Sequence, residues 1–142
     1  MTSVACPARV EDLELFADCT KEELRLLSGL ATPLHVSKGH VLMREGTIGR
    51  EFVIIGSGTA RVSRQTAEGV AEVAEVGSGE FLGEIALLTG VPRTATATAT
   101  TDLSVLVSSI SEFRTMLRVA PSVAEKVRRA STARAAELGL AA

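Results

Sequence analysis

Apolar and polar residues follow a helical spacing at both ends of the chain and a strand-like spacing in the middle. Near the N-terminus, Val10, Leu13 and Phe16 recur at helical intervals and predict a first helical segment. A second helix is expected after Thr20, because the hydroxyl of Thr20 and the carboxylate of Glu23 have the spacing of a capping box. Its buried face is expected to consist of three leucines: Leu24, Leu27 and Leu30.

From Pro33 onward, the pattern changes to short β-prone runs separated by turn residues such as Glu45-Gly46 and Gly77-Ser78-Gly79. Threonine and alanine alternate over residues 94–101, which predicts a strand with one residue type on each face. Many short strands at close spacing favour a sandwich or barrel over alternating β-α-β units. The expected strands are residues 34–36, 41–43, 52–55, 60–63, 70–76, 94–101 and 103–107.

The C-terminal part returns to helical spacing. Phe113 and Met116 predict one helix, and Pro121 suits the first turn of a last helix that runs to about Leu138. We therefore expect a mainly β fold, a barrel or jelly roll over residues 33–109, with N-terminal helices in 1–32 and C-terminal helices in 110–142. A length of 142 residues suits a single domain, residues 1–142, and no linker rich in Pro, Ser or Gly divides it.

Composition narrows the classes of function. A hydrophobic fraction of 46% argues against disorder, and a net charge of −2 argues against a duplex-binding module. Trp and Tyr are absent, which disfavours stacking on single strands. Cys6 and Cys19 are too few for a disulfide framework. No signal peptide or membrane span is apparent, so a cytoplasmic location is expected.

The segment from Phe81 to Thr96 carries the chemistry. Gly83 allows the backbone to approach a ligand closely, and residues 84–88 predict one helical turn with free N–H groups for an anion. Arg93 follows a proline turn and can grip the same anion with two parallel hydrogen bonds. A carboxylate at Glu84 would repel that anion unless it accepts a hydroxyl, so the pattern indicates an anion beside a sugar hydroxyl.

This segment resembles the phosphate-binding cassette of the cyclic-nucleotide-binding domain family, which includes the catabolite activator protein and the regulatory subunit of protein kinase A. The family pattern is roughly Phe-Gly-Glu-(Leu/Ile)-Ala-Leu, a short variable stretch, then Pro-Arg-(Ser/Thr/Ala)-Ala. The chain has one extra residue, Leu82, as many bacterial members do, so it is identified as a bacterial member. The resemblance extends from about Phe16 to Leu138, with the cassette at residues 81–96.

The resemblance implies roles for individual residues. Glu84 would accept a hydrogen bond from the ribose 2′-OH, and Arg93 would hold the cyclic phosphate. In the family the last helix covers the base, and Arg134 and Leu138 are the candidates for this lid. The other expected ligand contacts are Gly83, Ile85, Ala86, Thr94 and Ala95.

The chain also departs from the family pattern, and some alternatives remain open. Arg50 stands where the family often has an acidic residue, and the last helix has no aromatic residue to stack on a base. Glu84 and Arg93 would also be compatible with a plain surface ion pair. Thr94 resembles members that accept cyclic GMP, but a threonine in an alternating strand needs no ligand. His35 and His40 are too few for a metal-dependent jelly-roll enzyme.

The expected function is regulatory binding of a cyclic nucleotide, cyclic AMP in preference to cyclic GMP, with no catalysis and no cofactor. Movement of the lid helix would pass to an effector domain or partner protein, and a homodimer through the C-terminal helix is compatible with the pattern. No DNA-binding domain and no membrane span are expected in this chain. The alternative is a module that kept the fold and lost the ligand, acting only in structure or protein interaction.

Overall fold

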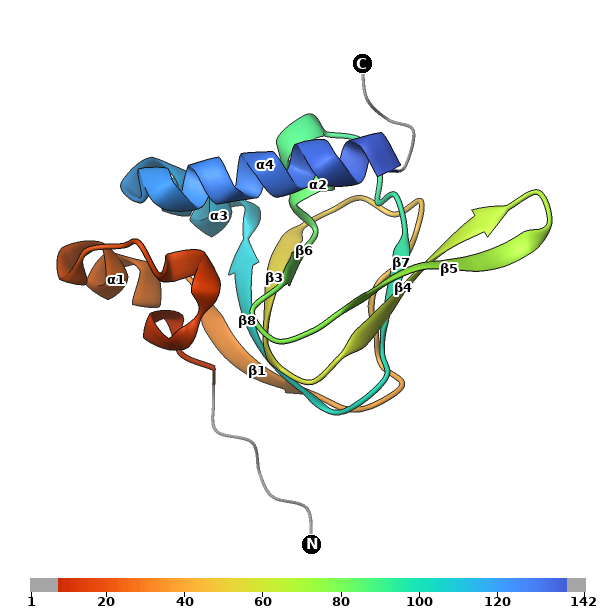
Figure 1. The fold of residues 1–142 in the computed structure, drawn as a ribbon, viewed down its shortest axis with the longest axis horizontal. Coiled ribbons are helices and arrows are strands. Elements are labelled where there is room, and N and C mark those ends of the chain that lie inside the picture. The colour runs from red at the N-terminus through yellow and green to blue at the C-terminus, as the bar shows by residue number, and fades with distance from the viewer. Residues whose placement is uncertain (1–7, 138–142) are drawn as a thin grey trace, which may run out of the picture.

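The computed structural model describes residues 8–137, whose strands form two four-stranded antiparallel sheets with helices at both ends (Figure 1). The first sheet contains, in spatial order, β1 (Thr32–Val36), β8 (Leu103–Ser109), β3 (Glu51–Ser57) and β6 (Phe81–Leu82). The second contains β2 (Val41–Met43), β7 (Thr96–Ala99), β4 (Ala60–Thr66) and β5 (Gly69–Val76). The predicted mainly β jelly roll with flanking helices is therefore confirmed.

Four α-helices accompany the sheets in the described part of the chain: α1 (Lys21–Ser28), α2 (Glu84–Thr89), α3 (Ile110–Val119) and α4 (Pro121–Glu137). The predicted capping box starts α1, since the backbone N–H of Glu23 donates to Thr20 Oγ1 at 3.1 Å and the N–H of Thr20 donates to Glu23 Oε1 at 3.0 Å. Leu138, the predicted end of the last helix, lies outside the described residues.

The first predicted helical segment differs from the expectation. It consists of two short 3₁₀ turns, Val10–Asp12 and Glu14–Phe16, because Leu13 between them has an extended backbone with φ −102° and ψ 137°. The apolar residues of this segment are nevertheless buried, so helical spacing identified the inward face without identifying the helix type.

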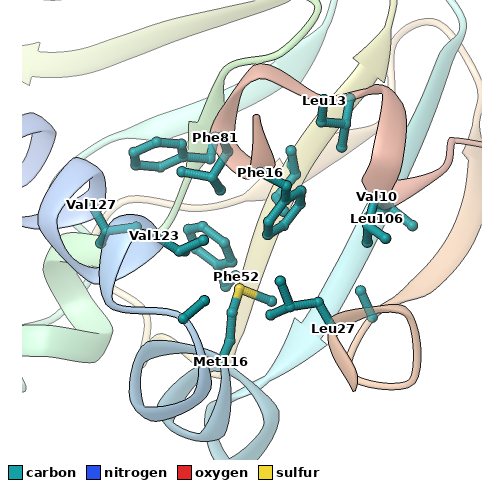
Figure 2. Packing of buried hydrophobic residues seen from close by; sticks show 14 of the residues in the cluster. Val10, Leu13, Phe16, Leu27, Phe52, Phe81, Leu106, Met116, Val123 and Val127 are labelled. Carbon is teal, nitrogen blue, oxygen red and sulfur yellow. The ribbon is translucent and has the colours of Figure 1, made fainter. Parts of the chain in front are cut away.

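Buried hydrophobic residues join the helices to the first sheet (Figure 2). The ring centroids of Phe52 and Phe113 lie 4.5 Å apart, and those of Phe52 and Phe81 lie 5.4 Å apart. Phe16 and Met116 complete this cluster from the N-terminal turns and from α3. Because Phe81 is the first residue of the cassette, the core fixes the cassette relative to α3 and α4.

The threonine–alanine alternation forms a strand only in part. Ala97 and Ala99 share one face, as predicted, and that face is buried, but β7 begins at Thr96 rather than at residue 94. The chain just before β7 is held elsewhere, because the backbone N–H of Arg93 donates to the carbonyl of Thr47 at 2.7 Å. Thr94 and Ala95 therefore lie outside the ladder and face a cavity instead.

The C-terminal helix crosses one end of the barrel. In Figure 1, α4 (blue) lies across that end beside α2, which it contacts, while the β4–β5 hairpin projects past the barrel. Within residues 8–137, no helix has the length and apolarity needed to cross a bilayer. The arrangement leaves a space bounded by the cassette, the β4–β5 hairpin and α4.

Candidate functional site

A cavity of about 660 Å³ lies between the cassette, strands β4 and β5, and helix α4. Its lining includes every cassette residue predicted as a ligand contact, together with Arg134 of the predicted lid: Gly83, Glu84, Ile85, Ala86, Arg93, Thr94, Ala95 and Arg134. The fold thus brings residues 50 positions apart to one space. Leu138, the other predicted lid residue, lies outside the described residues.

Gly83 connects β6 to α2, and its backbone conformation favours glycine. Its φ is +97°, a region that L side chains rarely adopt. A Cβ at this position would lie 2.6 Å from Arg93 Nη1 and 2.7 Å from the carbonyl oxygen of Glu51. The missing side chain therefore leaves the space in which the Arg93 guanidinium lies.

Arg93 is buried, at 7% exposure, and is held by backbone carbonyls rather than by a carboxylate. Its Nη1 donates to the carbonyl of Gly83 at 3.0 Å, and its Nη2 donates to the carbonyl of Glu51 at 2.7 Å. Burial lowers the pKa of the guanidinium, and the negative charges of Glu51 and Glu84 oppose that shift. Carbonyl oxygens do not neutralise a cation, so Arg93 keeps its charge available for an anion.

Glu84 is a buried carboxylate, with 1% of its surface exposed. Its Oε1 accepts a hydrogen bond from Arg134, whereas its Oε2 is buried without a hydrogen-bond partner among the described residues. Burial raises the pKa of Glu84, and the charge of Arg134 opposes the rise. A buried polar atom without a partner is costly, so this oxygen is a candidate acceptor for a donor from a ligand.

Arg134 reaches the cassette from α4. It forms an ion pair with Glu84, and its guanidinium carbon lies 5.0 Å from the centre of the Phe81 ring, within cation–π range. The alternative of a surface ion pair between Glu84 and Arg93 is wrong, because both side chains are buried and the ion-pair partner of Glu84 is Arg134.

Two features of this site escaped the sequence reasoning. The carbonyl of Glu51 holds Arg93, and backbone atoms leave no signature in residue types. Strands β4 and β5 contribute Val62 and Val73 to the cavity wall, which only the sheet register reveals. Within residues 8–137, no group of three or more His, Cys, Asp or Glu side chains is arranged to hold a metal ion.

The Glu84–Arg134 pair predicts a pH-dependent stability. A carboxyl whose pKa is raised by folding contributes stability at low pH, and that contribution is lost as the pH rises through the folded-state pKa. Arg134→Ala removes the opposing charge, raises this pKa further and extends the loss to higher pH. We expect the melting temperature of the variant, relative to wild type, to fall as the pH rises above 4.5, the ordinary pKa of a glutamate.

Thermal unfolding followed by circular dichroism across this pH range measures the effect. Arg128→Ala is a matched control, because Arg128 lies on the same helix, is exposed and pairs with Glu125. Parallel stability–pH curves for Arg134→Ala and wild type would contradict the assignment.

The sequence model of the cyclic nucleotide-binding domain family matches residues 33–119. The chain is 36% identical over 107 residues to the acetyltransferase Pat of Mycolicibacterium smegmatis, which covers 75% of this chain and 32% of that protein. It is 32% identical over 108 residues to a cAMP-dependent protein kinase regulatory subunit of Yarrowia lipolytica, which covers 76% of this chain and 28% of that protein.

Among solved structures, the catabolite activator protein of Thermus thermophilus superimposes with a TM-score of 0.77 at 27% identity, covering 89% of this chain and 60% of that one. The chain thus spans about a third or less of the two curated relatives. The match of the family model across the barrel, together with the fold and the cassette at its cavity, shows that the chain belongs to the cyclic nucleotide-binding domain family.

Proposed function

We propose that this chain binds a cyclic nucleotide in the cavity, with the ribose 2′-OH on Glu84 and the cyclic phosphate on Arg93. The observation that carries the proposal is Glu84 itself. Its carboxylate is 1% exposed, lies in the cavity wall and has one oxygen without a partner in the described structure. A hydroxyl donor from a ligand would satisfy that oxygen, and a ribose brings such a donor beside a phosphate.

Arg93 supports the phosphate half of the proposal. Its two hydrogen bonds to carbonyls use two of the five N–H donors of a guanidinium and fix the side chain in the cavity wall. The rest of the cassette would complete the anion contacts through backbone groups and one hydroxyl. These residues are Gly83, Ile85, Ala86, Thr94 and Ala95, all of which line the cavity.

Arg134 of α4 covers Glu84, and this contact supports a role of α4 as a lid. Arg134 occupies one carboxylate oxygen, and the other oxygen is also shielded from solvent. A ribose hydroxyl therefore reaches Glu84 only if Arg134 shifts or shares the carboxylate. We propose that nucleotide binding moves α4 in this way, as a shift toward the conformation that the nucleotide prefers. Ala130 and Ala133 of the same helix line the cavity and would follow this movement.

Cyclic AMP is proposed as the preferred ligand over cyclic GMP. The Yarrowia lipolytica relative is named for cyclic AMP, and the cavity lining near β4 and β5 includes apolar Val62 and Val73, which suit either purine. Thr94 lines the same cavity and is the residue that would admit cyclic GMP as a weaker ligand.

Isothermal titration calorimetry with each nucleotide tests the proposal. We expect saturable binding at one site per chain, tighter for cyclic AMP than for cyclic GMP. The absence of heat with either nucleotide at millimolar concentration would overturn the proposal in favour of a module that has kept the fold without the ligand. Tighter binding of cyclic GMP would overturn only the preference.

The output is proposed to be regulatory and to need no cofactor. The relatives are much longer than this chain, so an effector domain or a separate partner protein would receive the movement of α4. We also propose a homodimer through α4 as a route for transmitting that movement. Size-exclusion chromatography with light scattering, with and without nucleotide, measures that oligomeric state.

A further inference from the structure

The loop between β2 and β3, residues 44–50, packs against the cassette at Arg93. The backbone N–H of Gly46 donates to the carbonyl of Arg93 at 2.8 Å, and the N–H of Arg93 donates to the carbonyl of Thr47 at 2.7 Å. One step further, the N–H of Glu45 donates to Thr96 Oγ1 at 3.0 Å. These bonds fix the main chain of Arg93 to a loop that lies more than 40 positions earlier in the sequence.

Gly49 of this loop lies directly against the guanidinium of Arg93. A Cβ at Gly49 would lie 3.1 Å from Arg93 Cζ, 3.2 Å from Arg93 Nη1 and 2.7 Å from the Cβ of Ala86. Its φ is not in the left-handed region, so the backbone itself would accept an L side chain. What excludes a side chain here is the cassette: the guanidinium of Arg93 on one side and α2 on the other.

The guanidinium is thereby confined from several directions. Its two terminal nitrogens donate hydrogen bonds to the carbonyls of Gly83 and Glu51. Its central carbon and Nη1 lie beside Gly83 and Gly49, where a Cβ on either residue would crowd them. A shift of a few tenths of an ångström would lengthen both hydrogen bonds and turn the remaining donors away from the cavity. Charge-assisted hydrogen bonds to an anion depend on that alignment.

We infer that Gly49 is a positioning residue for phosphate recognition: the absence of a side chain there leaves room for the Arg93 guanidinium, which the carbonyls of Gly83 and Glu51 hold at the cavity. The inference rests on the proposed function, since it assigns Gly49 to the phosphate half of the same site. Gly49 is not among the residues that line the cavity, so it would act through Arg93.

Gly49→Ala is the direct test, with cyclic AMP and adenosine as paired ligands. Adenosine carries the same base and ribose without the phosphate. We expect Gly49→Ala to weaken cyclic AMP binding about tenfold and to leave adenosine binding within about twofold of wild type. A loss confined to the phosphate-bearing ligand would not arise from a general loosening of the barrel.

Gly77→Ala is the matched control, because a Cβ at Gly77 would meet only ordinary contacts, 3.7 Å from the carbonyl of Gly58 and 3.8 Å from Thr59 Cγ2. A double-mutant cycle adds a second readout. In the Arg93→Ala background there is no guanidinium to displace, so adding Gly49→Ala should change cyclic AMP affinity by less than about twofold.

If Gly49→Ala does not fold, Gly49→Ala combined with Ala86→Gly removes the shortest contact and retains the approach to Arg93. Ala86→Gly alone is then the reference for this double variant, because Ala86 itself lines the cavity. The same selective loss is expected. Three results would each overturn the inference. Gly49→Ala could bind cyclic AMP as tightly as Gly77→Ala does, or it could lose as much affinity for adenosine as for cyclic AMP. Gly49→Ala could also weaken cyclic AMP binding by the full tenfold in the Arg93→Ala background. Failure of wild type to bind any cyclic nucleotide would instead overturn the proposed function.

Discussion

Replacement of Arg93 by alanine is expected to weaken cyclic nucleotide binding about 10–100-fold. A hydrogen bond to a charged group contributes about 1.5–3 kcal/mol, which corresponds to that range in the dissociation constant. Arg93 lines the cavity and has its charge unneutralised by the two carbonyls that hold it. Calorimetry with cyclic AMP measures the loss. Affinity equal to wild type would show that the phosphate does not bind at Arg93.

Stability must be separated from binding in this experiment. Arg93→Ala leaves the carbonyls of Gly83 and Glu51 without their donor, and a buried carbonyl without a partner costs about 1–3 kcal/mol. Urea unfolding therefore accompanies the titration, which is run at a temperature where the variant is folded. Arg93→Lys keeps the charge but not the planar fork, so an intermediate affinity is expected.

Replacement of Glu84 by alanine is expected to abolish discrimination between a ribose and a 2′-deoxyribose ligand. Wild type should bind cyclic AMP about tenfold more tightly than its 2′-deoxy analogue, because only the ribose supplies a donor for the unpaired Glu84 oxygen. Without the carboxylate the two ligands should bind alike, and the loss for cyclic AMP should be smaller than that caused by Arg93→Ala.

The two ligands in parallel make the Glu84 experiment internally controlled. Glu84→Ala also releases Arg134, whose ion pair and contact with Phe81 belong to the same cluster. Any effect of that release on the cavity falls on both ligands equally, whereas the hydroxyl contact affects only cyclic AMP. Persistence of the tenfold difference in Glu84→Ala would assign the 2′-OH to another residue.

Local sequence signals predicted local structure well. The Thr20–Glu23 capping box begins α1 as expected, and the alternation of small residues in β7 puts Ala97 and Ala99 inside the barrel. These features depend on neighbours within a few positions, so the sequence contains what is needed to predict them. The start of β7 at Thr96 was missed because the loop before it is bound to residues 46 and 47, far away in the sequence.

The cassette was predictable as a set of residues, but its partners were not. Arg134 pairs with Glu84 because tertiary packing brings α4 over the cavity: Phe113 of α3 packs on Phe52, and Val123 and Val127 of α4 belong to the same cluster. The carbonyl of Glu51 that holds Arg93 belongs to the backbone, which any residue would supply. Both contacts arise from tertiary structure, which neither spacing nor composition specifies.

The immobilised guanidinium of Arg93 has a thermodynamic consequence. A free arginine loses about 2 kcal/mol of rotamer entropy when it is fixed on a ligand, but here the folded protein has already frozen this side chain with two backbone acceptors. The phosphate would then lose bound water and gain hydrogen bonds from donors that are already in place. It would not have to immobilise a flexible arginine side chain. Capture of the anion should accordingly proceed without a slow side-chain search, and the proposed rearrangement of α4 would follow the encounter.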